Sequence, residues 1–213
     1  MTTEFVPFRK IGRLSRDMVV TEKLDGTNGV IFIGEPPVKA PYFDNHGIKG
    51  VYHEPGGQPE FLVGSRSRWI PQDTDNHGFA RWAYEHKDEL IAGLGPGWHH
   101  GEWWGKGIAR GYGINEKRFS LFNTSMWAVN EIALAAGAAQ RLPPACCHVV
   151  PILYRGPFRT ETVLDTMAGL KVTGSIAAPG FMRPEGVVVF HAQGNALFKK
   201  TFDKDDTGKD FGA

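Results

Sequence analysis

"TEKLDGTNGVIF", residues 21–32, places a lysine just before a glycine turn, with apolar and β-branched residues on both sides. The Asp25-Gly26 pair predicts a tight turn, so we expect strands over 19–23 and 30–33 to form a hairpin with a short loop. Lys23, at the end of the first strand, has two interpretations. It is either a solvated residue beside an acid or a nucleophile, and a nucleophilic lysine attacks only as the neutral amine.

The composition is that of a soluble globular protein. The chain has 213 residues, 41% of them hydrophobic and 22% charged, which is enough to bury the core of one domain. Its 27 glycines favour a fold rich in turns and strands. A formal net charge of +1 excludes a strongly basic, histone-like binder but leaves room for a local basic groove.

Targeting signals and disulfides are not expected. The first residues contain no continuous apolar run, and no stretch is long enough to span a membrane. Cys146 and Cys147 are adjacent, so they make a poor structural cross-link, and the "CCH" stretch lacks the spaced second pair of a zinc site. We therefore expect a cytoplasmic protein with no membrane partner.

The remaining segments indicate a sheet-rich fold. Residues 34–60, rich in glycine and proline, predict a long excursion. We expect helices over 76–94, 124–142 and 160–170, strands within 61–70, 97–108, 117–123 and 146–156, and a terminal hairpin over 185–202. These elements predict one α+β domain built on antiparallel sheet over residues 1–203, followed by a polar tail over 204–213.

Two acidic residues stand among apolar strand residues. Glu102 alternates with tryptophans in "HHGEWWGKG" and shares a sheet face with Trp104. A carboxylate buried there needs a partner or a metal, whereas an edge-strand glutamate would be solvated. Glu185 opens the apolar strand "EGVVVF", a position that suits a magnesium ligand or a ribose contact, or a strand end with no partner.

Several cationic and aromatic residues are also candidates for a functional site, each with a structural alternative. Lys199 and Lys200 are adjacent in a strand and face opposite sides, so one of them should face inward and need an anion such as phosphate, unless both protect a sheet edge. Arg66 and Arg68 suit bidentate phosphate contacts, or end a strand in solvent. Phe122 suits base stacking, although a strand phenylalanine is often core.

The order of these motifs resembles the covalent nucleotidyltransferase superfamily, which comprises polynucleotide ligases and mRNA capping enzymes. Lys-x-Asp-Gly is followed by an arginine-bearing strand, Gly-Glu, Phe-x-x-Phe, Glu-Gly-Val-Val and Lys-Lys, over residues 5–203. "EKLDGTN" is most similar to the RNA ligases of the second T4 phage type and the kinetoplastid RNA-editing ligases. DNA ligases and capping enzymes typically carry an arginine shortly after Asp-Gly, where this chain has Thr27 and Asn28.

The resemblance implies a role for each motif residue. Lys23 would be adenylated by ATP, Glu22 would read the adenine edge, and Asp25 and Asn28 would lie near the nucleotide. Glu102 would bind the ribose, Phe122 would stack on the base, and Arg66 (with Arg68 as the weaker candidate) would hold the ribose and the end to be joined. Glu185 would be the metal-associated acid, and Lys199 and Lys200 would neutralise the α-phosphate. Relatives space the two lysines by two positions, so which of them reaches the phosphate is open. Asn123 also stands where relatives often have aspartate.

The implied fold is an antiparallel-sheet adenylation domain of the ATP-grasp-like ligase type. Only 13 residues follow Lys200, so we expect no C-terminal OB domain. The implied activity is an ATP-dependent RNA ligase that acts in RNA repair. It would use Mg²⁺, or Mn²⁺ as an alternative, to seal 5′-phosphate and 3′-hydroxyl ends through a lysyl-AMP intermediate.

Two other functions stay open. One is a minimal DNA nick ligase, and the other is a self-adenylating nucleotide-binding module that senses nicks without sealing them. The expected partners are ATP and RNA or DNA ends in duplex or nicked form. The grip on nucleic acid would come from the domain's own surface, a partner chain or self-association.

Overall fold

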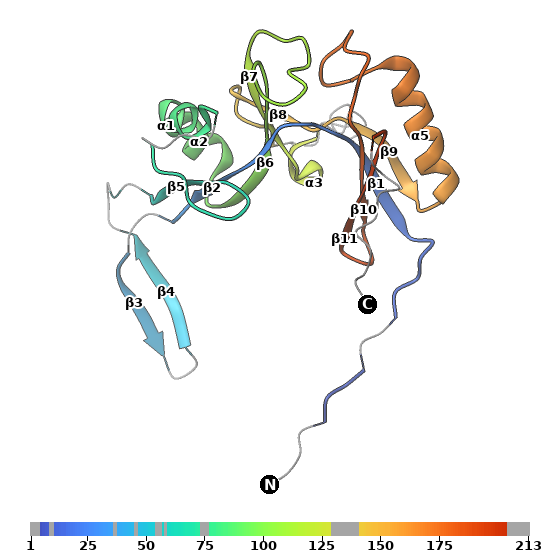
Figure 1. Cartoon of the computed structure of the whole chain (residues 1–213). Coiled ribbons are helices and arrows are strands. Elements are labelled where there is room, and N and C mark those ends of the chain that lie inside the picture. Colours follow the sequence, from blue (N-terminus) through green and yellow to red (C-terminus); the bar gives the residue numbers. More distant parts are fainter. Residues whose placement is uncertain are drawn as a thin grey trace, which may run out of the picture. The chain divides into compact units, whose positions relative to one another are not determined.

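The computed structural model describes residues 5–8, 11–35, 38–44, 47–53, 57, 59–72, 77–128 and 141–203. Its architecture is mixed α+β with antiparallel-rich sheets, as the sequence predicts. Two compact units are present (Figure 1): Met1–Lys23 with Pro151–Ala213, and Leu24–Val150. The chain therefore leaves the first unit immediately after Lys23 and returns to it after Val150.

The first unit is a four-stranded antiparallel sheet with one helix against it. Its elements are β1 (Asp17–Lys23), β9 (Ile152–Pro157), α5 (Thr160–Thr173), β10 (Gly186–His191) and β11 (Ala196–Thr201), and the strand order is β11-β10-β1-β9. Val163, Met167 and Leu170 of α5 recur at helical spacing and pack against Met18 and Val20 of β1. The predicted terminal hairpin is confirmed, because β10 pairs with β11.

The second unit is built on a five-stranded sheet of order β5-β2-β6-β7-β8. These strands are β2 (Thr27–Ile33), β5 (Phe61–Gly64), β6 (Gly97–Gly105), β7 (Lys117–Leu121) and β8 (Cys147–Val149). Helices α1 (Phe79–Glu85) and α2 (Lys87–Leu94) complete its core. Phe79 lies between Trp103 and Phe119, with ring centroids 5.6 and 5.0 Å away, so these rings join the first helix to the sheet.

The hairpin predicted around Asp25-Gly26 is wrong. Strand β1 pairs with β9 and β10, whereas β2 pairs with β5 and β6 in another sheet. The reason is where the turn's N–H groups donate. The N–H of Asp25 donates to the Tyr112 hydroxyl at 2.8 Å, and that of Gly26 donates to the Glu102 carboxylate at 3.1 Å. Side chains of the second unit thus hold these N–H groups, and the segment connects two sheets.

Two other elements are divided more finely than predicted. The helix expected over 76–94 breaks at His86, whose ψ of 16° separates α1 from α2. The strand expected over 146–156 is two strands in separate sheets, β8 and β9. Pro151 stands between them, and proline donates no ladder hydrogen bond.

Two expectations concern segments that are described only in part. Within 34–60, the strands β3 (Val38–Asp44) and β4 (Gly47–His53) pair in an antiparallel ribbon. Helix α3 (Thr124–Trp127) forms the first turn of the helix predicted over 124–142, and residues 129–140 lie outside the described part of the chain. In the ranges that the structure describes, no helix has the length and apolar character needed to cross a membrane.

Buried His99 makes the stability of the second unit depend on pH. Its Nε2 lies 2.9 Å from the Gly95 carbonyl oxygen, and burial lowers its pKa from the ordinary 6.5. Neutral His99 therefore stabilises the fold fully above the unfolded-state pKa, and this contribution is lost as the pH falls from 6.5 through the folded-state pKa. We expect a lower thermal midpoint by circular dichroism in mild acid than at neutral pH. His99→Gln should shrink that difference, and an unchanged difference would contradict this assignment.

Candidate functional site

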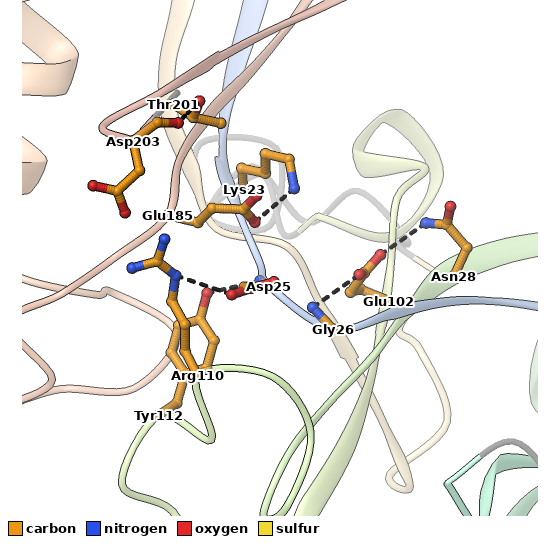
Figure 2. Close-up of polar contacts among 10 residues, drawn as sticks. All are labelled: Lys23, Asp25, Gly26, Asn28, Glu102, Arg110, Tyr112, Glu185, Thr201 and Asp203. Carbon is orange, nitrogen blue, oxygen red and sulfur yellow. Dashed lines mark hydrogen bonds and ion pairs between the residues drawn. The ribbon is translucent and has the colours of Figure 1, made fainter. Parts of the chain in front are cut away.

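Lys23 and Glu185 form an ion pair where the two central strands of the four-stranded sheet, β1 and β10, respectively end and begin. The Lys23 Nζ lies 2.6 Å from the Glu185 Oε2 (Figure 2), and their side chains are only 23% and 16% exposed. The β1–β10 register places Lys23 opposite Gly186, the residue after Glu185. With a φ of 150° and the Lys200 carbonyl close by, Gly186 has no room for a Cβ. Because Gly186 has no Cβ, β11 can approach β10 closely at this position. Glu185 lies directly before the first residue of β10.

Glu22 points away from Lys23, as successive strand residues must. It lies on the buried side of β1 with 1% of its surface exposed. Its Oε2 accepts hydrogen bonds from the backbone N–H groups of Ile176 and Ala177 at 2.8 and 3.0 Å. Its Oε1 is buried with no hydrogen-bond partner in the described part of the chain. A buried acceptor without a donor is costly, so this oxygen suits a ligand that brings one.

The strand register separates the two terminal lysines. Lys199 opposes Val188, which opposes Thr21, so Lys199 shares the sheet face of Lys23. Lys200 is in register with Val187 and lies on the opposite face, which α5 covers. Of the adjacent pair, Lys199 is thus the residue on the face that carries the Lys23–Glu185 ion pair.

In the second unit, Glu102 is the centre of a directional hydrogen-bond network (Figure 2). The β2–β6 register places Asn28 directly opposite Glu102. The Asn28 Nδ2 donates to the Glu102 Oε2 at 2.8 Å, and the Arg66 Nε donates to the Asn28 Oδ1 at 2.7 Å. The Gly26 N–H also donates to Glu102. The sequence left open whether Glu102 is buried or solvated; the structure shows that it is buried and that its carboxylate has hydrogen-bond donors.

Asp25 is held by two residues that the sequence reasoning missed, Arg110 and Tyr112. The Arg110 Nε donates to the Asp25 Oδ2 at 3.0 Å, and the Tyr112 hydroxyl accepts the Asp25 N–H (Figure 2). Tyr112 has a positive φ of 52° and lies between Gly111 and Gly113, whose φ angles are 65° and 66°. The two glycines beside Tyr112 in "RGYG" are the available sequence signal, because glycine is the usual residue where the chain adopts a positive φ.

Trp104 packs against both Tyr112 and Gly26. Its ring packs edge-on against Tyr112 with centroids 4.8 Å apart, and its Nε1 donates to the Ser120 hydroxyl at 2.9 Å. Its Cβ lies 2.8 Å from where a Cβ on Gly26 would stand. The glycine of the motif is therefore required by close packing.

The other predicted residues lie apart from this network. Phe122 is 42% exposed directly after β7, whereas Phe119 is buried in the core. Arg66 and Arg68 both lie exposed in the bend after β5, and of the two it is Arg66 that donates to Asn28. Among the described residues, no group of three or more histidine, cysteine, aspartate or glutamate side chains could hold a metal ion. Glu185 by itself supplies one carboxylate.

Comparison with known proteins assigns the family. A family model described as RNA ligase matches residues 16–202, so the chain belongs to the RNA ligase family. The expected family resemblance is thereby confirmed. No curated protein matches the sequence.

Several solved structures of Naegleria gruberi RNA ligase share the fold. A mutant with ATP and Mn gives a TM-score of 0.55 at 15% identity, covering 89% of this chain and 51% of that chain. A mutant with AMP and Mn gives 0.52 at 16% identity, covering 88% and 50%. The same ligase with PPi gives 0.51 at 17% identity, again covering 88% and 50%. The chain thus spans about half the length of these ligase chains.

Proposed function

We propose that this protein is an ATP-dependent RNA ligase that joins a 5′-phosphate end to a 3′-hydroxyl end through a lysyl-AMP intermediate on Lys23. The observation that carries the proposal is the 2.6 Å contact between Lys23 and Glu185 at a strand end, in a chain of the RNA ligase family. The Naegleria ligase structures with ATP, AMP, Mn and PPi support the use of ATP and a divalent metal.

In the first step, Lys23 attacks the α-phosphorus of ATP. A P–N bond forms while the bond from the α-phosphorus to the pyrophosphate oxygen breaks, and pyrophosphate leaves. The attacking amine must lose a proton, and the Glu185 carboxylate at 2.6 Å is placed to accept it. Lys199, on the same sheet face as Lys23, would neutralise charge on the α-phosphate, whereas Lys200 lies on the other face.

The donor set suits a divalent cation bound partly by the substrate. Mg²⁺ is typically held by one or two carboxylates together with phosphates and water, and Glu185 offers one carboxylate. Among the described residues no group of three or more histidine, cysteine, aspartate or glutamate side chains could hold the ion, so the phosphates of ATP would supply further ligands. Bound there, Mg²⁺ or Mn²⁺ would neutralise phosphate charge.

Two further steps complete the reaction. The 5′-phosphate of the RNA attacks the lysyl-AMP, which breaks the P–N bond and leaves AMP on that end. The 3′-hydroxyl then attacks the activated 5′-phosphate, and AMP departs as the phosphodiester forms. For these steps we propose that Glu102 binds the ribose, Asn28 and Asp25 lie near the nucleotide, Arg66 holds the end to be joined, and Phe122 stacks on the base. Residues 1–203 would form the adenylation domain, of the ATP-grasp-like ligase type, and 204–213 a polar tail.

The test is covalent labelling followed by sealing. The protein is incubated with Mg²⁺ and ATP labelled at the α-phosphate, and then offered nicked duplexes with ribose or deoxyribose at the 3′-hydroxyl side. We expect label that survives denaturing gels and sealing that favours ribose. Sealing of the deoxyribose nick alone would favour a DNA nick ligase. Labelling without any sealing would favour a nick-sensing module, and no labelling of the folded protein would overturn the proposal.

Glu22 provides a test of base selection. Its Oε1 lacks a donor in the described residues, and the exocyclic amine of adenine would supply one. Guanine carries a carbonyl oxygen there, which the carboxylate would repel. In Glu22→Gln, the amide oxygen still accepts the N–H groups of Ile176 and Ala177, so the amide nitrogen becomes a donor. We expect labelling by ATP to fall about tenfold or more, with GTP gaining relative to ATP. An unchanged ATP-to-GTP ratio would contradict this role.

A further inference from the structure

An exposed stack of aromatic rings continues from the Glu102 network on one face of the second unit. In the β2–β6 register, Asn28 opposes Glu102 and Phe32 opposes Trp98. Residues two apart in a strand share a face, so Trp98 and His100 lie in line with Glu102 on β6. The polar network and these rings therefore occupy one continuous sheet face.

The rings of this stack are ordered with respect to one another. Trp69 and Trp98 have centroids 5.5 Å apart with an interplanar angle of 24°, and Trp98 and His100 are stacked at 6.3 Å and 10°. Phe32 supports Trp98 from 4.8 Å. Trp98 and Trp69 are nevertheless 59% and 44% exposed. Large aromatic surface that is left in water and held in a fixed geometry marks an interaction site.

The turn after β5 fixes Trp69 in the stack and adds positive charge beside it. The Ser65 N–H donates to the Arg68 carbonyl oxygen at 2.8 Å, which folds the chain back so that Trp69 bridges to Gly64. The same turn contains Arg66 and Arg68, both exposed. Guanidinium groups beside exposed aromatic rings are the combination that binds phosphates and bases of unpaired nucleic acid.

We propose that the aromatic stack, defined as Phe32, Trp69, Trp98 and His100, binds unpaired bases of the RNA substrate. A base in a duplex is already stacked on both faces, so only an unpaired base offers a free face to Trp69 or Trp98. The substrate class is therefore an RNA end with unpaired nucleotides close to the junction. This inference rests on the proposed ligase function, because the bound strand is the one to be joined.

The test compares matched variants of the full chain. Trp69→Leu/Trp98→Leu keeps apolar bulk without aromatic faces, and Trp69→Phe/Trp98→Phe retains the faces. Binding is measured by fluorescence anisotropy with a labelled single-stranded oligouridylate and with a fully paired nicked duplex. For the single strand, we expect the leucine variant to bind about tenfold or more weakly and the phenylalanine variant within about threefold of wild type. Duplex binding should change by less than about twofold in both.

Arg68 gives an independent measurement that leaves the rings intact. Arg68→Gln should lower the slope of log affinity against log salt for the single strand by about 0.7, the value for one phosphate contact. In addition, quenching of wild-type tryptophan fluorescence by the oligouridylate should fall in Trp98→Phe. Both readouts test the surface even if the leucine variant unfolds, which circular dichroism would reveal.

The outcomes separate this inference from the proposed function. If wild type fails to label with ATP but still shows the aromatic dependence of binding, the ligase proposal fails and the surface stands. If the leucine variant labels normally and binds single-stranded RNA as tightly as wild type, the inference is overturned. If its only change is lost self-association in sedimentation, the face is an interface between copies of the chain, which also overturns the inference.

Discussion

Lys23→Ala is expected to abolish covalent labelling by ATP, a loss of at least about a thousandfold, because no other group replaces a removed nucleophile. The amine lies 2.6 Å from Glu185 and is largely shielded from solvent. Its surroundings therefore hold it in one place and offer an acceptor for its proton. Labelling is read as radioactivity that stays with the protein on a denaturing gel.

Lys23→Arg is the matched control for this experiment. Arginine keeps the positive charge and the means to pair with Glu185, but it stays protonated in proteins and cannot attack. We expect it to bind ATP and to melt close to the wild-type temperature while remaining unlabelled. Label on either folded variant would show that the nucleophile is another residue. An alanine variant that unfolds would leave Lys23→Arg to decide the question.

The sequence predicts the elements of the fold better than their pairing. The strand-like stretches on either side of Gly194 correctly predict a hairpin, because the N–H groups of its turn donate to residues of the hairpin itself: that of Gly194 to the His191 Nδ1 and that of Asn195 to the Ala192 carbonyl oxygen. The Asp25-Gly26 turn has the same local signal, yet its N–H groups donate to Glu102 and Tyr112, which lie far along the chain. Local propensity predicts that the chain turns at Asp25-Gly26, whereas contacts with residues far along the sequence determine which sheet the next strand joins.

Pairing is also what the sequence could not supply for the candidate site. The order of the motifs identifies Glu102 and Asn28 as separate candidate site residues. Only the register of β2 against β6 shows that they lie opposite each other. The same holds for Lys199 and Lys200, since the two faces of β11 are assigned only once β10 is aligned with β1. The glycines beside Tyr112 indicate a turn, but nothing in the sequence shows that Arg110 in that turn contacts Asp25.

Glu102→Gln is expected to disrupt the second unit's network because its hydrogen bonds run in one direction. Arg66 donates to Asn28, Asn28 donates to Glu102, and the Gly26 N–H donates to the other carboxylate oxygen. A glutamine amide group would meet a donor whichever way it turns, and rotating Asn28 would only move the conflict to Arg66. Because the hydrogen bonds to the Glu102 carboxylate are charge-assisted, we expect the variant to lose about 2 kcal/mol of free energy of unfolding and to seal about a hundredfold more slowly. Urea denaturation and single-turnover sealing measure the two effects.

Adding Asn28→Asp to that variant tests the direction of the network. The new carboxylate accepts from Arg66 and from the glutamine amide, while the glutamine oxygen accepts the Gly26 N–H, so every donor again meets an acceptor. The net charge is unchanged. We expect the double variant to regain stability to within about 1 kcal/mol of wild type, a coupling that independent sites would not show. Sealing should stay slow, because the carboxylate proposed to bind the ribose has moved from β6 to β2. Recovery of both properties would instead make Glu102 a positioning residue, and recovery of neither would mean that the hydrogen-bond directions have been assigned wrongly.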